Sequence, residues 1–200
     1  VGRDVFGDRL LNSMSKAGVN IECIEREDTS TGIAVINVDK EGNNNIVVIP
    51  GANQKVDIDY LYRHICAFEK ADVVVFQLEI PLESVREGLK ISKKLGKTTI
   101  LNPAPAHQLD EEIIKYVDIL IPNEHELERI SRKEINSHEA IIDAASLLLK
   151  KGVKQLVITL GDKGVLYIDN AGYKLFDAYK VEAVDTTAAG DSFIGGFVSS

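Results

Sequence analysis

A run of small residues near the end of the chain has the composition of an anion-binding site. It spans residues 185–191, with the sequence Asp-Thr-Thr-Ala-Ala-Gly-Asp, and precedes an apolar stretch at 193–198. Alanine and glycine let a ligand approach the backbone closely, and the first N–H groups of a helix have no partner within it. Because these donors and the positive end of the helix dipole point the same way, the run predicts an anion pocket at a helix start.

Asp191 lies at the mouth of this predicted pocket. Its carboxylate either adds a favourable charge at the start of the helix or acts as a general base beside a bound phosphate. For an isolated Gly-Asp pair the first interpretation is the more common one. The polar positions elsewhere in the chain favour the second.

Polar or glycine residues also follow four predicted strands, at the point where each strand should end. They are Glu79, Asn102, Asn123 and the group formed by Thr159, Gly161 and Gly164. Each position alone is explained by an ordinary loop. In an open α/β sheet, however, ligands bind beyond the carboxyl ends of the strands, so four such positions together predict a site.

Several common catalytic motifs are absent from the sequence. No G-x-x-x-x-G-K-[ST] is present, and no G-x-G-x-x-G follows a strand, which excludes a P-loop enzyme and a dinucleotide fingerprint. His125-Glu126 is followed by Arg129 where a metalloprotease helix needs a second histidine. G-x-S-x-G is missing, which removes the simplest hydrolase interpretation.

The elements that must position these residues follow from hydrophobic periodicity and from Gly and Pro punctuation. Strands that alternate with helices predict parallel βαβ units with helices on both faces of the sheet. Two polar turns between β-branched or aromatic segments predict hairpins at 31–49 and 165–176. Helices are expected at 4–17, 57–68, 81–95, 110–116, 123–130 and 137–151, and further strands at 21–24, 72–77, 98–101, 118–121 and 155–160.

Composition limits the class of protein. The 200 residues suffice for one domain, and the net charge of −8 argues against a nucleic-acid surface. Two cysteines in no metal-ligand pattern favour a reducing compartment, here the cytoplasm, and no apolar run reaches membrane-spanning length. The chain starts without Met and stops within an apolar helical pattern, so we expect an internal portion of a longer protein.

The chain resembles the ribokinase-like sugar kinases over essentially its whole length. The resemblance implies a three-layer α/β/α fold with a mainly parallel central sheet and a small β lid that includes residues 31–50. It also implies a single domain over residues 1–200, truncated at both ends. The motifs that carry it are Gly2-x-Asp4-x-Phe6-Gly7, Thr31-Gly32, Pro50-Gly51-Ala52-Asn53, Gln77-Leu78-Glu79-x-Pro81-Leu82-Glu83, Asn102-Pro103-Ala104-Pro105-Ala106, Pro122-Asn123-Glu124-x-Glu126, Thr159-Leu160-Gly161-x-x-Gly164 and Asp185-Thr186-Thr187-Ala188-Ala189-Gly190-Asp191.

By this resemblance, Asp191 is the base that takes the proton from the primary hydroxyl of the sugar. The amides of Ala188, Ala189 and Gly190 would stabilise the phosphoryl oxygens, and Glu79 with Asp191 would contact the sugar. The family usually has Gly at the position of Ala188. The residues that match the ATP site are Asn123, Thr159, Leu160, Gly161, Asp162, Lys163, Gly164 and Gly190.

The resemblance also implies two cations. Glu126 would hold Mg²⁺ through its water shell, and Asp185 with Thr187 would form part of a K⁺ site that activates the enzyme. The family's N-terminal sugar-binding segment, and the C-terminal segment that lines adenine and completes the K⁺ shell, are absent from the sequence.

The expected activity is ATP-dependent phosphorylation of ribose to ribose 5-phosphate, with a homodimer formed through the β lid. Kinases of the same family that act on fructose, a deoxyribose or a nucleoside remain alternatives. A nucleotide-binding fragment without activity is an alternative of another class. No membrane or nucleic-acid partner is expected.

Overall fold

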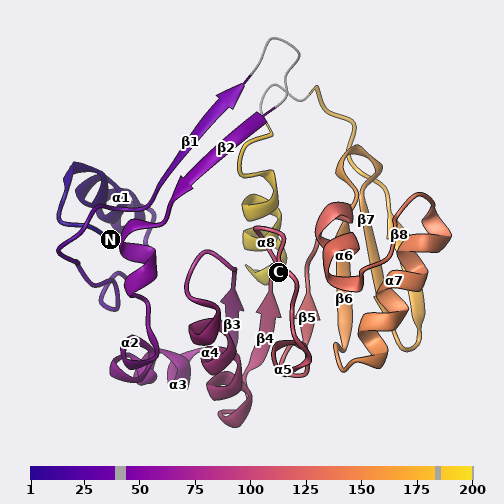
Figure 1. The fold of residues 1–200 in the computed structure, drawn as a ribbon, viewed down its shortest axis with the longest axis horizontal. Helices are drawn as coiled ribbons and strands as arrows, with labels where there is room; N and C mark the ends of the chain where they lie inside the picture. The colour runs from indigo at the N-terminus through magenta and orange to yellow at the C-terminus, as the bar shows by residue number, and fades with distance from the viewer. Residues whose placement is uncertain (39–43, 183–185, 200) are drawn as a thin grey trace. The chain divides into compact units, whose positions relative to one another are not determined.

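Two compact units make up the chain in a computed structural model, which describes residues 1–38, 44–182 and 186–199 (Figure 1). The first unit comprises residues 1–70 and 79–87, and the second comprises residues 71–78 and 88–200. The expectation of a single domain stays a prediction.

The first unit begins with helix α1 (Val5–Lys16), which Asp4 caps. One carboxylate oxygen of Asp4 accepts from the Gly7 amide at 2.8 Å, and the other accepts from the Thr31 amide at 2.7 Å. These backbone hydrogen bonds, that from Thr31 first, lower the pKa of Asp4 to about 2. The two motifs that contain Asp4 and Thr31 are therefore joined by one ionised carboxylate.

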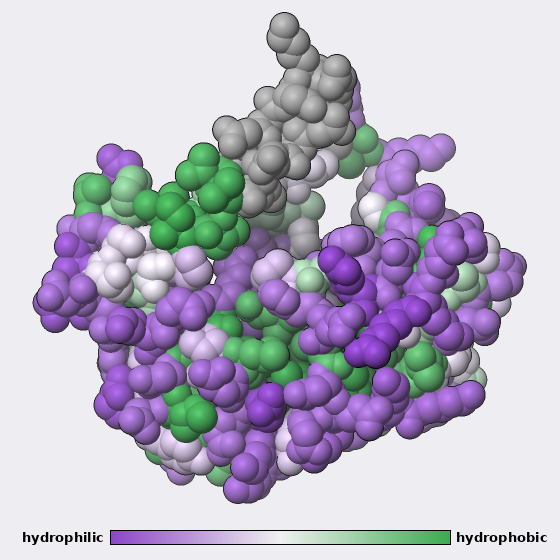
Figure 2. All heavy atoms as spheres, viewed as in Figure 1, coloured by the Kyte–Doolittle hydropathy of each residue, from purple (hydrophilic) through white to green (hydrophobic). Residues whose placement is uncertain are grey.

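Strands β1 (Ile33–Val38) and β2 (Asn44–Ile49) form the predicted antiparallel hairpin, with Ile33 paired to Ile49. Most of its predicted turn lies outside the described residues. Figure 2 shows apolar side chains gathered over this hairpin. Among them Val35, Val47, Val48 and Ile49 are each at least 45% exposed.

Two predictions for this unit are wrong. Residues 21–24 form a turn, closed by a hydrogen bond from the Ile24 amide to the Ile21 carbonyl, because the Tyr60 hydroxyl takes the Cys23 carbonyl that a strand would use. The helix expected at 57–68 is divided into α2 (Ile58–Arg63) and α3 (Ile65–Lys70), after the short helix η1 (Gly51–Lys55). His64 ends α2 with φ −109° and ψ 24°, and its ring contacts the Glu25 carboxylate at 2.9 Å.

The second unit contains a six-stranded sheet whose strands follow in chain order. Strands β3 to β6 are parallel, and β7 and β8 add an antiparallel hairpin at one edge. The sheet confirms the predicted α/β class and its mainly parallel order. The strands are β3 (Val73–Phe76), β4 (Thr98–Leu101), β5 (Ile119–Leu120), β6 (Gln155–Thr159), β7 (Val165–Asp169) and β8 (Gly172–Phe176).

The helices along these strands lie close to their predicted positions, apart from the one expected at 110–116. Only Glu111–Ile114 of that segment form a helix, α5. It ends there because the amides of Tyr116 and Val117 donate to the carbonyls three residues before them, and the Thr99 hydroxyl donates to the Tyr116 carbonyl at 2.6 Å. The other helices are α4 (Leu82–Lys94), α6 (Glu124–Ser131), α7 (His138–Lys150), η2 (Gly161–Lys163) and α8 (Ala189–Ser199).

Helices cover both faces of this sheet. Side chains alternate between the faces of a strand, so Val157 and its neighbours Leu156 and Ile158 point in opposite directions. Val157, with Ile100 and Ile121, packs against the apolar side of α8. Helices α6 and α7 contact strands β6 and β7 (Figure 1). Among the described residues no helix is both long and apolar enough to cross a bilayer.

Candidate active site

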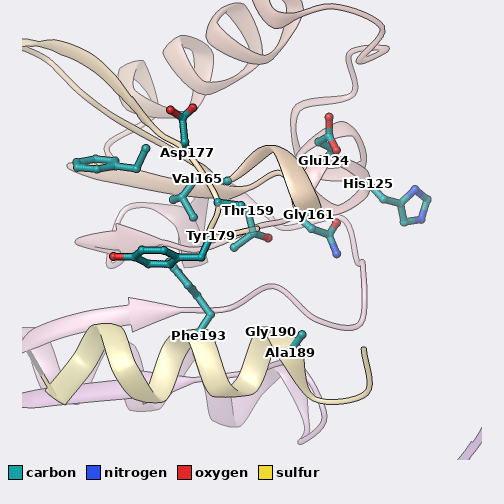
Figure 3. A pocket seen from close by; sticks show the side chains of 14 residues that line it. Glu124, His125, Thr159, Gly161, Val165, Asp177, Tyr179, Ala189, Gly190 and Phe193 are labelled. Atoms are coloured by element: carbon teal, nitrogen blue, oxygen red, sulfur yellow. The ribbon is translucent and has the colours of Figure 1, made fainter. Parts of the chain in front are cut away.

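The second unit contains a cavity of about 720 Å³ between the N-terminal half of α8 and the strands β6 to β8 (Figure 3). Residues directly after the carboxyl ends of β5 and β6 form part of its wall. This is the edge where ligands bind in open α/β sheets. Of the residues predicted from the sequence, the structure brings together Asn123, Thr159, Gly161, Gly164, Ala189 and Gly190 in this wall.

Two helices begin at this cavity. Glu124 and His125 in the first turn of α6 line it, and so do Ala189 and Gly190 in the first turn of α8. Each helix start presents amides without intrahelical acceptors and a positive end of its dipole. An anion in the cavity would therefore be favoured from two sides.

Asn123 and Glu126 form a capping box at the start of α6. The Asn123 side-chain oxygen accepts from the Glu126 amide at 2.8 Å, and a Glu126 carboxylate oxygen accepts from the Asn123 amide at 2.9 Å. This arrangement leaves the side-chain Nδ2 of Asn123 as the donor it can offer to the cavity. Burial raises the pKa of Glu126, and the hydrogen bond from the Asn123 amide opposes that shift.

The loop after β6 depends on glycine. Gly164 has φ 103°, and a Cβ placed on it would lie 2.0 Å from the Phe176 carbonyl oxygen. The Leu160 amide donates to the Gly164 carbonyl at 2.9 Å, which closes the loop. The Thr159 amide donates to the Pro122 carbonyl at 3.0 Å, so the ends of β5 and β6 are held together beside Asn123.

The start of α8 has the geometry of an anion-binding turn. Ala188 adopts φ 58°, a left-handed conformation that glycine accepts more readily. The Ser192 amide donates to the Ala188 carbonyl at 2.9 Å, and the Ala189 amide donates to the Thr186 carbonyl at 3.2 Å. Among the described residues, the amides of Gly190 and Asp191 have no acceptor. Of the three predicted donors, Ala189 is thus already engaged by a long bond.

An apolar wall completes the cavity. Phe193 of α8 and Tyr179 extend into the space between α8 and the β7–β8 hairpin (Figure 3), and Val165 and Phe176 line it from the hairpin. None of these four residues was predicted from the sequence as a site residue. A flat, apolar group such as a nucleobase fits a wall of this kind.

The other predicted site residues lie as follows. Lys163 forms an ion pair with Glu124 at 3.7 Å, and the Leu160 side chain is buried; neither residue belongs to the cavity wall. Asp162 and Asp191 are exposed, and neither belongs to the cavity wall. Glu79 lies in the first unit, exposed and with an interaction partner.

The predicted cation sites are only partly described. Thr187 lies in the turn before α8 and has a partner, whereas Asp185 lies outside the described residues. In the described part of the chain, no three His, Cys, Asp or Glu side chains cluster as metal ligands. Mg²⁺ is usually held by one or two carboxylates together with waters and substrate phosphates. Glu126 has one oxygen that the capping box does not use, but its side chain is buried and does not line the cavity, so it would reach the ion through water.

The comparisons with known proteins show the family of the chain. The model of the pfkB family of carbohydrate kinases matches residues 1–200. The chain is 42% identical to a ribokinase of Schizosaccharomyces pombe, over all of this chain and 64% of that protein. It is 38% identical to a ribokinase of Staphylococcus aureus, over all of this chain and 66% of that protein. It is also 36% identical to a deoxyribokinase of Salmonella typhi, over 98% of this chain and 65% of that one.

The solved structures point the same way. Ribokinase from Thermotoga maritima has a TM-score of 0.87 and 38% identity, covering 99% of this chain and 64% of its own. Ribokinase from Arabidopsis thaliana, solved with ribose and ATP, has a TM-score of 0.88 and 30% identity, covering 99% and 66%. The chain therefore spans about two thirds of the length of the curated relatives it matches. It belongs to the pfkB family of carbohydrate kinases.

Proposed function

We propose that the protein containing this chain transfers the γ-phosphoryl group of ATP to the primary hydroxyl of ribose, forming ribose 5-phosphate. The main support for the proposal is that two helix starts and an apolar wall line one and the same cavity. Helix starts suit phosphates, and the apolar wall suits a nucleobase. The choice of ribose as the sugar is inferred from the ribokinases among the relatives.

In the proposed reaction, Asp191 accepts the proton of the attacking hydroxyl. The hydroxyl oxygen then forms its bond to the γ-phosphorus, and the bond to the β–γ bridging oxygen breaks, which releases ADP. The amides at the start of α8, led by that of Gly190, donate to the phosphoryl oxygens as charge develops there. Asn123 and the loop from Thr159 to Gly164 hold the remaining phosphates and the nucleoside. Phosphoryl transfer requires mainly such alignment and charge stabilisation.

Two cations belong to the proposal. Glu126 would hold Mg²⁺ through water, and the ion would neutralise charge on the phosphates. K⁺ at Asp185 and Thr187 rests on the sequence motif alone. Neither cation alters the part assigned to Asp191.

Ribose is favoured over a deoxyribose by the number of ribokinases among the relatives, and Glu79 is the proposed sugar contact. A deoxyribokinase at 36% identity makes 2-deoxyribose the specific alternative. We also propose a homodimer through the β1–β2 hairpin, since the exposed side chains of Val35, Val47 and Ile49 share one face of it and form an apolar surface of the kind that dimers bury.

A coupled assay of ADP release tests the proposed reaction. The full-length protein is assayed with ribose, 2-deoxyribose, fructose and a nucleoside, with and without K⁺. We expect the highest kcat/KM with ribose. A preference for 2-deoxyribose would replace ribose within the same chemistry, whereas ATP turnover with none of these sugars would overturn the proposed function.

A further inference from the structure

A second cavity, lined by charged side chains, lies at the opposite end of the strands of the same sheet, where the parallel strands begin. It has a volume of about 360 Å³, and its wall includes the first residues of β4, β5 and β6, which are Thr98, Ile119 and Gln155. The nucleotide cavity follows the carboxyl ends of β5 and β6 instead, so the two cavities are separated by the length of the strands.

Three lysines and one aspartate provide the charge of this second cavity: Lys93, Lys97, Lys154 and Asp118. Their formal sum is positive, whereas the chain as a whole carries −8. A local excess of positive charge in an acidic protein attracts anions over a short range that salt does not fully screen.

Asp118 holds two of these lysines in place. Its side chain is only 10% exposed, and one of its oxygens accepts from the Lys93 ammonium at 2.7 Å and from the Lys154 ammonium at 2.8 Å. The other oxygen also accepts from the Lys93 ammonium, at 2.8 Å, and from the amide and the hydroxyl of Thr99, each at 3.0 Å. Two ammonium groups that share one carboxylate oxygen must lie close to each other, and they are ordered before any ligand arrives.

This order matters because an ammonium group has three donors. Lys154 contacts Asp118 with one of them, so others remain for a ligand. The conformational cost of ordering two long side chains is already met by the contacts with Asp118, and a preorganised donor binds more tightly than a mobile one.

A favourable interaction with a helix dipole explains the presence of only one of the three lysines. Lys93 lies in the last turn of α4, where a cation offsets the helix dipole. Lys97 and Lys154 lie beyond the ends of α4 and α7, and both face the same cavity.

We infer that this cavity is a binding site for a phosphate group, either inorganic phosphate or a small phosphate monoester. Three ammonium groups and one carboxylate line the cavity, and this excess of positive charge suits an anion. The tetrahedral oxygens of phosphate suit donors that converge from different elements, here from α4, from the turn before β4 and from the turn before β6. The site is independent of the proposed kinase cavity.

The test is a calorimetric titration of the full-length protein with inorganic phosphate, at constant ionic strength set with chloride. A second arm uses ribose 5-phosphate, to separate the free ion from an ester. Each titration is repeated with a non-hydrolysable ATP analogue present, so that binding at the nucleotide cavity is recognised by its loss. Unfolding temperatures are recorded for every variant.

We expect saturable phosphate binding that the ATP analogue leaves unchanged. Loss of one charged donor should weaken it by about fivefold to tenfold, so Lys154→Met and Lys97→Met should both bind less well. Lys154→Arg keeps the charge and should retain binding. Lys150→Met is the matched control, because Lys150 is an exposed lysine on α7 outside the cavity wall.

Three results would overturn the inference. They are phosphate binding that the ATP analogue abolishes, equal affinity in Lys97→Met and the unchanged protein, or no saturable binding at all. If Lys154→Met lowers the unfolding temperature strongly, the comparison of Lys97→Met with Lys150→Met decides alone.

Discussion

Glu126 combines a structural and a proposed catalytic role, and two substitutions separate them. In the capping box one carboxylate oxygen accepts from the Asn123 amide at 2.9 Å. Glu126→Gln keeps a side-chain oxygen at that position and removes the charge. Glu126→Ala removes both and leaves the amide without its partner, which costs about 1–2 kcal/mol.

The expected stabilities follow from these contacts. Glu126→Ala should lower Tm by about 2–6 °C. At neutral pH, the Tm of Glu126→Gln should lie within about a degree of that of the unchanged protein, or higher than it. Because burial raises the pKa of Glu126, the folded state disfavours its charged form. The unchanged protein therefore loses stability relative to Glu126→Gln as pH rises above the ordinary glutamate value of about 4.3.

The functional assay is the dependence of ATP turnover on Mg²⁺ concentration. If Glu126 holds the water shell of the metal, Glu126→Gln should need about tenfold or more Mg²⁺ for half-maximal rate while remaining stable. An unchanged Mg²⁺ requirement in Glu126→Gln would refute the metal role. Equal destabilisation by Gln and Ala would refute the capping argument.

The remaining predictions concern backbone strain and buried charge. Gly164→Ala should cost about 3 kcal/mol or more and weaken ATP binding, because a Cβ there lies 2.0 Å from the Phe176 oxygen; urea unfolding and calorimetry check this, and a neutral outcome would count against the loop geometry. Ala188→Gly should stabilise the protein by about 0.5–1 kcal/mol, since relief of the left-handed strain exceeds the entropy that glycine adds to the unfolded chain, and a clear loss of stability would contradict this. Asp118→Asn should cost about 2 kcal/mol at pH 7. Burial alone would raise the pKa of Asp118, but hydrogen bonds from Lys154, Lys93 and Thr99 outweigh it and hold that pKa far below its usual range. The difference in urea unfolding between the two proteins should therefore persist down to about pH 4 and shrink below it, and a difference that grows with acid would be inconsistent.

The order of the sheet could be predicted from the sequence because buried parallel strands are continuous apolar runs between glycines and helices. Residues 155–160 and 98–101 are mostly apolar or β-branched, and both form strands within a residue of the expected ends. The two errors in the first unit have another origin. The Tyr60 hydroxyl bonds the Cys23 carbonyl and the His64 ring contacts Glu25, and no local pattern reveals contacts between residues about forty positions apart.

The polar half of the nucleotide cavity was predictable for the same topological reason. Asn123 follows β5 and Thr159 ends the neighbouring parallel strand β6, so the fold itself brings them together. The apolar half was not, because Phe176, Tyr179 and Phe193 have no distinctive spacing and are brought together only by the path of the chain after β8. Asn123 and Glu126 have the three-residue spacing of a capping box, whereas the resemblance implied a metal role for Glu126.

The central claim is that Asp191 removes the proton from the sugar hydroxyl beside a bound nucleotide. It is tested most directly by kcat and ATP affinity in the Asp191→Asn protein, whose side chain has nearly the same shape and no basic carboxylate. We predict a loss of kcat of about 10²–10⁴-fold or more, with ATP affinity nearly unchanged. Turnover close to that of the unchanged protein would contradict the account.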